Sequence, residues 1–492
     1  SQHRGGRIGD GICVAHIGHV GTHDATGGFD VPAYRRSSHR VDLDDLDQPA
    51  VAGEQPRDRA TDPIATASDH ADLAVEKSAP VIDGGHVPGC LRGHGADATR
   101  RRGRGRRLTA WRRFAPMLSL FDDYPIHQTP EPVAHPASSD KDVYERYWFN
   151  GYSSAGDMYF GVGTAYYPHL GIRDCGISLV VDGVQHAFHA SSRAGNEPTD
   201  MTIGPFRLTI VEPMRSCRIT LDANDTDMRC DLTFDGRTGN VEEPRHHFGR
   251  GLRKTMDTTR FTHLGRWTGW IECDGQRIEI EAAATPGTKD RSWGLRPLAG
   301  GDRRGAPDSA RGNGIFFLWA PLHFDDLAAH YQLFEDTLGR PLFSVGALLP
   351  LYESSTAIPG VEDPAVRHMR NNEHRLTFEN GSRMIKAAQL AFTSIDDDER
   401  YEIELEKIFT FRMKGIGYTH PEWGHGMWKG DLAMDIERWP LADVDDTAFD
   451  NQHVQHLVRA RMGERVGIGA LEQLCFGPYK PYGFTGAIDP PR

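Results

Sequence analysis

The sequence lacks several features that would suggest a function directly. Its 492 residues contain no run of 18 apolar residues, so we expect no integral membrane span. The seven cysteines include no CxxC pair, which excludes a cysteine-rich zinc module and a small disulfide-stapled domain. No GxSxG, Walker A or EF-hand motif occurs. The net charge of −13 argues against a chain-wide nucleic-acid binder, because phosphate recognition needs a basic surface.

Lysine and aromatic residues are scarce in residues 1–116. This stretch has 16 arginines, a single lysine (Lys77), four aromatic residues and no sustained apolar period. It cannot bury enough apolar surface to offset the entropy of ordering. Three interpretations are open: a basic nucleic-acid-binding tail, a natural disordered extension, or a GC-rich upstream region read as coding, since Met117 is the first methionine. We predict a disordered or spurious N-terminal extension.

A secretory signal is also lacking after either candidate start. The residues that follow Met117, LSLFDD, have neither a basic n-region nor a long apolar h-region. The cysteine usage favours a reducing compartment. We therefore expect a cytoplasmic protein.

The rest of the chain has a mainly β pattern. Apolar and polar residues alternate in segments that turn at Asp182-Gly183, Asp274-Gly275 and Asn380-Gly381, which are typical hairpin turns. Such segments predict roughly 14–18 strands. One helix is expected at residues 450–461, where apolar residues approach helical spacing. Long helices between strands are absent, which argues against a doubly wound α/β fold.

A Gly-, Arg- and Asp-rich stretch at residues 298–313 interrupts this pattern. It predicts a long loop between two β domains, which span residues 117–299 and 314–480.

The densest group of candidate functional residues is TKDRSWGLRP, residues 288–297. Asp290 could act as an acid or base if Arg291 or Arg296 held it in place. The competing interpretation is structural, with an Asp–Arg bridge and Trp293 joining the domains. We expect Trp293 at the contact between the two domains and Asp290 paired with Arg291 or Arg296.

A second dense group is YTHPEWGHGMW, residues 418–428. His420, Glu422 and His425 offer nitrogen and oxygen ligands, but a proline and two glycines preclude a regular helix and no HExxH occurs, so we expect no metal. The loop is either a polar and aromatic pocket wall or a packed cap on a barrel. We expect it to share a cavity or junction with residues 290–296, so that these three side chains find hydrogen-bond partners there.

Other histidines are weaker candidates. His323 follows an apolar segment, and His246 and His247 stand among charged residues. We expect His323 in a solvated turn and the other two in a surface loop.

The element KDRSWGLRP resembles the D-H-S-W-G-x-R element of the hydroxyneurosporene synthase/AttH-like superfamily. Residues 415–430, GIGYTHPEWGHGMWKG, and 463–478, GERVGIGALEQLCFGP, resemble an actinobacterial and proteobacterial branch of it. Arg291 replaces the histidine that usually follows the aspartate, so no role of that histidine is carried over. The superfamily includes carotenoid 1,2-hydratases, Diels–Alderase-like enzymes and ceramide-handling survival-factor proteins.

Members of this superfamily have two consecutive lipocalin-like β-barrels. The resemblance therefore implies a mainly β protein with two lipocalin-like antiparallel β-barrels after the N-terminal extension. A barrel of this type offers an apolar cavity for a hydrophobic small molecule such as an isoprenoid, a steroid or an acyl lipid. One hypothesis is a hydratase, cyclase or isomerase that needs no cofactor.

The catalytic candidates are Asp290 and Glu422. The substrate-binding candidates are Arg291, Trp293, Arg296, His420, Trp423 and His425, and the π faces of the two tryptophans could stabilise a carbocation. A second hypothesis is a non-catalytic lipid carrier with the same cavity, and a weaker one is a carbohydrate-active β-sandwich. Two ionisable groups within hydrogen-bond reach of each other in the cavity would favour catalysis over binding.

Overall fold

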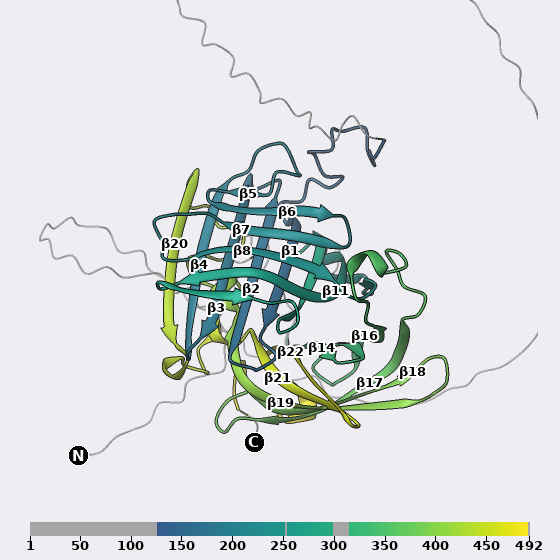
Figure 1. Ribbon diagram of the computed structural model, residues 1–492. Helices are drawn as coiled ribbons and strands as arrows, with labels where there is room; N and C mark the ends of the chain where they lie inside the picture. The colour runs from purple at the N-terminus through teal and green to yellow at the C-terminus, as the bar shows by residue number, and fades with distance from the viewer. Residues whose placement is uncertain (1–124, 251–252, 299–313, 491–492) are drawn as a thin grey trace, which may run out of the picture. The chain divides into compact units, whose positions relative to one another are not determined.

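The computed structural model describes residues 125–250, 253–298 and 314–490 (Figure 1). Within these ranges the chain is antiparallel β-structure with short 3-10 turns and no α-helix. No helix in this part of the chain is long and apolar enough to span a membrane. The prediction for residues 1–116 lies outside the described residues.

The first sheet has 14 strands, in the order β20-β4-β3-β2-β1-β13-β11-β8-β7-β6-β5, and β9, β10 and β12 also pair with β11. It curls, because the last strand, β5, contacts β3 and β4. Its strands are β1 (Val143–Tyr152), β2 (Met158–Tyr167), β3 (Ile172–Val181), β4 (Val184–Arg193), β5 (Thr202–Ile203), β6 (Phe206–Glu212), β7 (Ser216–Leu221), β8 (Arg229–Gly236), β9 (Val241–Glu242), β10 (His246–Arg250), β11 (Arg253–Cys273), β12 (Gln276–Ile280), β13 (Pro286–Leu295) and β20 (Leu432–Pro440).

The second sheet is a closed barrel of eight strands. They are β14 (Ile315–Phe324), β15 (Leu327–Glu335), β16 (Pro341–Pro350), β17 (Arg367–Phe378), β18 (Ile385–Ser394), β19 (Arg400–Arg412), β21 (Val454–Met462) and β22 (Arg465–Phe476). The 3-10 turns are η2 (Ser355–Ala357), η3 (Met413–Ile416), η4 (Leu441–Asp443), η5 (Phe449–Asn451) and η6 (Lys480–Tyr482). The predicted fold class, two antiparallel lipocalin-like β-barrels, is confirmed, and a β-sandwich is not what the described residues form.

Local sequence signals explain several turns. At Asp182-Gly183 and Asp274-Gly275 both residues have positive φ, as a type I′ hairpin requires. The helix predicted at residues 450–461 is wrong. Most of it is strand β21, which pairs with β19 on one side and β22 on the other. Pairing on both sides of a closed barrel outweighs the weak helical spacing of its apolar residues.

One strand crosses between the two halves of the sequence. β20 follows the six closed-barrel strands β14–β19 along the chain, yet it pairs with β4 at the edge of the first sheet from Leu432↔Ser192 to Pro440↔Val184. Figure 1 shows β20 in yellow-green beside the blue strands of that sheet. The loop that leads to it, residues 417–431, therefore belongs to the surroundings of the first sheet.

Three apolar clusters follow from strand alternation. The first lies inside the first barrel and includes Phe149 and Trp267, and the second lies inside the closed barrel and includes Leu318 and Tyr331. The third joins the outer faces of the two barrels through Trp148, Tyr152, Tyr159, Phe317, Trp319 and Phe411. Each large ring removes about 150–250 Å² from water, so this contact is a substantial interface.

Glycines on the outer face of the first barrel permit the close packing of this third cluster. A Cβ added to Gly161 of β2 would lie 2.4 Å from Trp148 and 2.8 Å from Phe411, and one added to Gly176 of β3 would lie 2.7 Å from the Cα of Ile416. The Gly-rich strand pattern thus serves the approach of η3 and β19.

Candidate active site

Strand β13 carries the predicted motif and presents it on two faces. Its register places Asp290 opposite Trp148 of β1 and Thr262 of β11, whereas Arg291 lies opposite Tyr147 and Phe261. Because successive side chains of a strand alternate, Asp290 and Arg291 point to opposite sides of the sheet. Asp290 therefore faces the second barrel, and Arg291 faces the interior of the first.

A buried ion cluster lies where the two barrels meet, and we call Glu243, Arg260, Asp290 and His330 the junction cluster. Arg260 Nη2 donates to Asp290 Oδ2 at 2.5 Å, and Arg260 Nε lies 3.0 Å from Glu243 Oε2. His330 Nε2, from β15 of the closed barrel, is 3.6 Å from Glu243 Oε1. Glu243 also accepts a hydrogen bond of 2.8 Å from Thr262. One guanidinium thus holds two carboxylates.

The two carboxylates of the cluster differ in their electrostatics. Burial and, to a smaller extent, the charge of Glu243 raise the pKa of Asp290 to about 6 against the opposing effect of Arg260. Burial also acts to raise the pKa of Glu243, but Arg260 and His330 outweigh it and hold that pKa well below its usual value. Paired carboxylates whose pKa values are driven apart are characteristic of acid–base sites.

A second polar network continues the cluster into the closed barrel. His453, which directly precedes β21, donates to Glu472 of β22 at 2.8 Å. Gln455 of β21 donates to the same carboxylate at 2.6 Å. Gln455 in turn accepts hydrogen bonds from Asn150 of β1, at 3.1 Å, and from Tyr159 of β2. These bonds tie the polar side chains of both barrels into one junction.

Several buried polar atoms at the junction have no hydrogen-bonding partner among the described residues. They include Asp290 Oδ1, Trp148 Nε1, Trp319 Nε1, His330 Nδ1 and the side-chain amide of Gln332. Buried polar groups are normally satisfied by protein, water or ligand, so this many in one place is unusual. The aromatic rings of Trp148, Tyr159 and Phe411 lie in the same interface. The junction combines free polar groups with an apolar aromatic wall.

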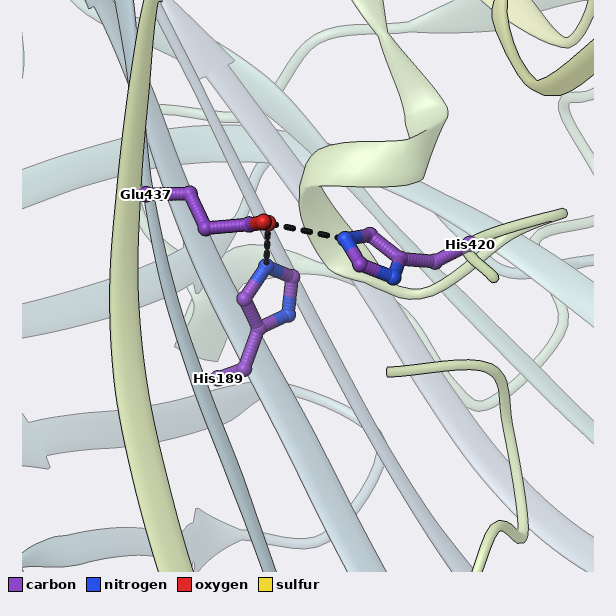
Figure 2. Close-up of side chains that lie close together, drawn as sticks. All are labelled: His189, His420 and Glu437. Atoms are coloured by element: carbon purple, nitrogen blue, oxygen red, sulfur yellow. Dashed lines mark hydrogen bonds and ion pairs between the residues drawn. The ribbon is translucent and has the colours of Figure 1, made fainter. Parts of the chain in front are cut away.

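Figure 2 shows a further cluster, which consists of His189 of β4, His420 of the loop before β20, and Glu437 of β20. Their nitrogen and oxygen atoms lie within 4.8 Å of one another. Both imidazoles approach the same oxygen, Glu437 Oε2, with Nε2 distances of 3.2 Å for His189 and 2.8 Å for His420. His420 Nδ1 lies 3.0 Å and 2.8 Å from the backbone N–H groups of Glu422 and Trp423 and accepts from both. Its proton is therefore on Nε2, which donates to Glu437.

This hydrogen-bond pattern does not fit a metal site. A metal bound at Nε2 would require the proton of His420 on Nδ1, where it would oppose the two backbone N–H groups. The set instead clamps an ionised carboxylate between two neutral imidazoles. Hydrogen bonds from His189 and His420 hold the pKa of Glu437 well below its usual value, and burial lowers the pKa of His189.

The structure places most of the predicted site residues apart from Asp290. The prediction that Trp293 lies at the inter-domain contact is wrong: it is 38 % exposed and packs on Phe261, because its odd position puts it on the opposite face of β13 from Asp290. The pairing of Asp290 with Arg291 or Arg296 is also wrong, since Arg260 of the neighbouring strand holds Asp290. Arg291 lies on the other face of β13, and Arg296 follows the end of that strand and lies over Tyr418.

The 418–428 loop meets the end of β13 but not Asp290. The guanidinium of Arg296 lies over the Tyr418 ring at 5.4 Å. His420 pairs with Glu437 and His425 faces Asp174 at 3.9 Å, while Trp423 stacks on His189 and the Glu422 side chain is 73 % exposed, 4.0 Å from Lys429. The expected bonds from this loop to Asp290, Arg291 or Arg296 are therefore wrong.

The polar residues that surround Asp290 escaped the sequence analysis. None of them stands in a local motif: Arg260, His330 and Glu472 lie in ordinary strands, and Glu243 directly follows the short strand β9. His323 and His246, expected in solvated segments, are buried, and His246 stacks on Phe343. A charged residue on the outer face of a strand signals burial only when the second barrel is known to cover that face.

The chain belongs to a protein family of unknown function, DUF8625, whose profile matches residues 118–485. Comparison with curated proteins gave no match. Among solved structures, it is similar to a provisionally assigned AttH from Nitrosomonas europaea (TM-score 0.42, 13 % identity, 73 % of this chain and 99 % of that one). It is also similar to kievitone hydratase from Nectria haematococca (TM-score 0.40, 13 % identity, 67 % and 88 %) and to CghA with Sch210972 (TM-score 0.40, 10 % identity, 68 % and 89 %). Similarity at this level does not bear on the activity of this chain.

Proposed function

We propose that this protein is an acid–base enzyme that needs no cofactor and acts on a hydrophobic small molecule at the junction of its two barrels, as a hydratase, cyclase or isomerase. The observation that carries the proposal is the state of Asp290. One of its oxygens is fixed by Arg260, the other has no partner in the described chain, and its raised pKa keeps a protonated fraction near neutral pH.

Asp290 is the proton donor in this proposal. The proton leaves a carboxyl oxygen for a carbon of an alkene or the oxygen of a carbonyl, and the resulting carboxylate stays paired with Arg260. In a hydration, water then adds to the carbocation and returns a proton, which restores Asp290. The side-chain amide of Gln332, which has no partner among the described residues, could orient that water.

The aromatic wall accounts for the proposed substrate class. Trp148 and Trp319 are buried in the interface, and a positive charge that develops on a substrate would be stabilised by their π faces. Three ionisable groups, Asp290, Arg260 and Glu243, are in contact there, which is the arrangement that favours catalysis over simple binding. The resemblance of KDRSWGLRP to the hydroxyneurosporene synthase/AttH-like element supports a functional role for Asp290. On this ground we also propose that the protein is a member of that superfamily.

A test can proceed without a known substrate. The protein is incubated in H₂¹⁸O with a panel of linear isoprenoids, unsaturated fatty acids and steroid enones, and products are identified by mass spectrometry. A hydratase adds one ¹⁸O-water to its substrate, and an isomerase or cyclase gives a product of unchanged mass but new retention time. We expect turnover of at least one compound and its loss in Asp290→Asn.

Matched variants separate chemistry from folding. Asp231→Asn removes another carboxylate paired to an arginine, Arg218, on the same sheet and should retain activity. Glu422→Gln tests the other acid proposed from the sequence, and its exposure leads us to expect full activity. Turnover in folded Asp290→Asn equal to that of the unmodified protein would overturn the proton-donor role of Asp290, and binding of these compounds without turnover of any of them would favour the alternative of a non-catalytic lipid carrier.

A further inference from the structure

A pocket of about 830 Å³ lies in the first barrel on the opposite side of β13 from Asp290. Arg291 and Tyr147, which face the barrel interior, contribute to its wall, together with Leu208 and Ile210 of β6. The volume is within the range of about 300–1,000 Å³ found for small-molecule sites. We call this space the barrel pocket.

The wall of the barrel pocket is mostly apolar and partly closed by the segment before β1. Val133, Ala134 and Pro136 line it, and His169 Nε2 donates to the carbonyl of Ser138 at 2.6 Å, which ties this segment to the β2–β3 turn. A non-strand segment held over an apolar cavity shields a hydrophobic ligand from water.

Two guanidiniums are fixed in this apolar wall by tyrosine rings. Arg291 lies over Tyr147 at 4.3 Å, with Glu145 as its carboxylate partner, and Arg173 lies over Tyr166 at 4.8 Å. Stacking on a ring holds a guanidinium in one orientation, so little conformational entropy is lost when it binds an oxygen acceptor.

Arg173 has hydrogen-bonding capacity left. The residue is 96 % buried, its Nη2 donates to the carbonyl of Glu197, and its Nε has no partner among the described residues. Glu145, Glu197 and Asp200 balance the charges of the three arginines on the wall, so the unused N–H donor of Arg173 rather than net charge distinguishes the site. A carboxylate is the acceptor whose planar geometry matches a guanidinium.

We infer that the barrel pocket binds an amphiphile with one carboxylate, such as a fatty acid, with its head group at Arg173 and its apolar body against Tyr147, Leu208 and Ile210. The site is separate from the junction cluster, and the inference does not rest on the proposed function. It gives the first barrel a ligand of its own, on the other face of the strand that carries Asp290.

The experiment measures displacement of the fluorescent fatty acid cis-parinaric acid from the full-length protein by dodecanoic acid and by 1-dodecanol. A hydrogen bond to a charged group predicts that the acid displaces the probe at a concentration about tenfold lower than the alcohol. Arg173→Gln should reduce this ratio to below about threefold. The concentration at which 1-dodecanol displaces the probe should stay the same. Arg218→Gln, which alters an exposed arginine outside the pocket, is the matched control.

Two further variants keep the inference falsifiable if Arg173→Gln fails to fold. Ile210→Trp places a larger ring in the pocket and should weaken binding of the probe, with an unchanged thermal midpoint. Asp290→Asn should leave probe binding intact, which separates this site from the proposed enzyme activity. Equal displacement by acid and alcohol in the unmodified protein, or full probe binding in folded Ile210→Trp, would overturn the inference.

Discussion

Arg260 holds Asp290 through one terminal nitrogen at 2.5 Å and faces Glu243 through its Nε at 3.0 Å. The guanidinium is the only strong cation that the structure places between these two buried carboxylates within residues 125–250, 253–298 and 314–490. Its removal would leave two buried acids without a compensating charge. The geometry of the junction thus depends on a residue in the middle of the longest strand, β11.

Arg260→Met should therefore destabilise the protein strongly. Breaking a buried ion pair from one side costs about 3–5 kcal/mol, because the remaining charge is left unpaired. The matched change Arg218→Met removes an exposed partner of Asp231 and should cost at most about 1 kcal/mol. Urea unfolding followed by tryptophan fluorescence measures both. Similar losses for the two variants would show that the Arg260 contacts are no stronger than a surface pair.

Asp290 should make stability fall as the pH rises. Its pKa is raised to about 6 in the folded protein, so the folded state binds the proton more tightly than the unfolded state does. The stabilisation is complete below the unfolded pKa of about 3.9 and is lost as the pH rises through about 6. The unfolding free energy of the unmodified protein minus that of Asp290→Asn should therefore decrease from pH 4 to pH 7. A difference that grows over that range would mean that the folded pKa is lowered instead.

Glu437 should hold the 418–428 loop and β20 against the first sheet. Glu437→Gln replaces the ionised acceptor of two imidazole N–H groups with a neutral amide, and we expect a loss of about 1–2 kcal/mol. Hydrogen–deuterium exchange over residues 432–440 should rise in this variant. The exposed neighbour Asp435→Asn serves as the control, and unchanged exchange in Glu437→Gln would contradict the clamp.

The same cluster should respond to acid through His189. Burial lowers its pKa, so the neutral imidazole is favoured in the folded state and the stabilisation is present above the unfolded pKa of about 6.5. It is lost as the pH falls below that value, because the unfolded state then binds the proton more readily. Exchange over residues 432–440 should therefore increase between pH 7 and pH 5 relative to other edge strands, and a flat profile would count against it. Zinc should give no protection, since His420 presents a proton at Nε2.

Gly176 should not accept a side chain. The added Cβ of Gly176→Ala would lie 2.7 Å from the Cα of Ile416, so the backbone of η3 has to move. We expect the free energy of unfolding to fall by about 1–3 kcal/mol, the usual cost of overpacking a rigid contact. Gly195→Ala meets nothing within 4 Å and should be neutral. Thermal unfolding of both variants measures the difference, and equal midpoints would show that the contact with η3 is loose.

The sequence analysis succeeded where the signal was local. Alternation and the Asp182-Gly183 turn predicted hairpins that the structure contains. It failed where the partner of a side chain depended on which strand lies beside its own in the sheet. The partner of Asp290 is Arg260, about thirty positions away on β11, whereas Arg291 is adjacent in sequence but on the other face of the sheet.

The prediction of hydrogen-bond partners for the 418–428 loop failed for a related reason. The partner of His420 is Glu437, and only the pairing of β20 with β4 brings that carboxylate to His189. No turn or spacing in the sequence shows that a strand from the second half joins the first sheet. Long-range pairing of this kind is set by burial of whole faces rather than by any local pattern.

The raised pKa of Asp290 is the central claim, and it can be measured directly. Protein labelled with ¹³C at the aspartate carboxyl carbons is titrated by NMR, and the Asp290 signal is assigned by its absence in Asp290→Asn. We predict a midpoint near the value of about 6, well above that of an ordinary aspartate. A midpoint at or below about 4, the ordinary aspartate value, would contradict the proton-donor role.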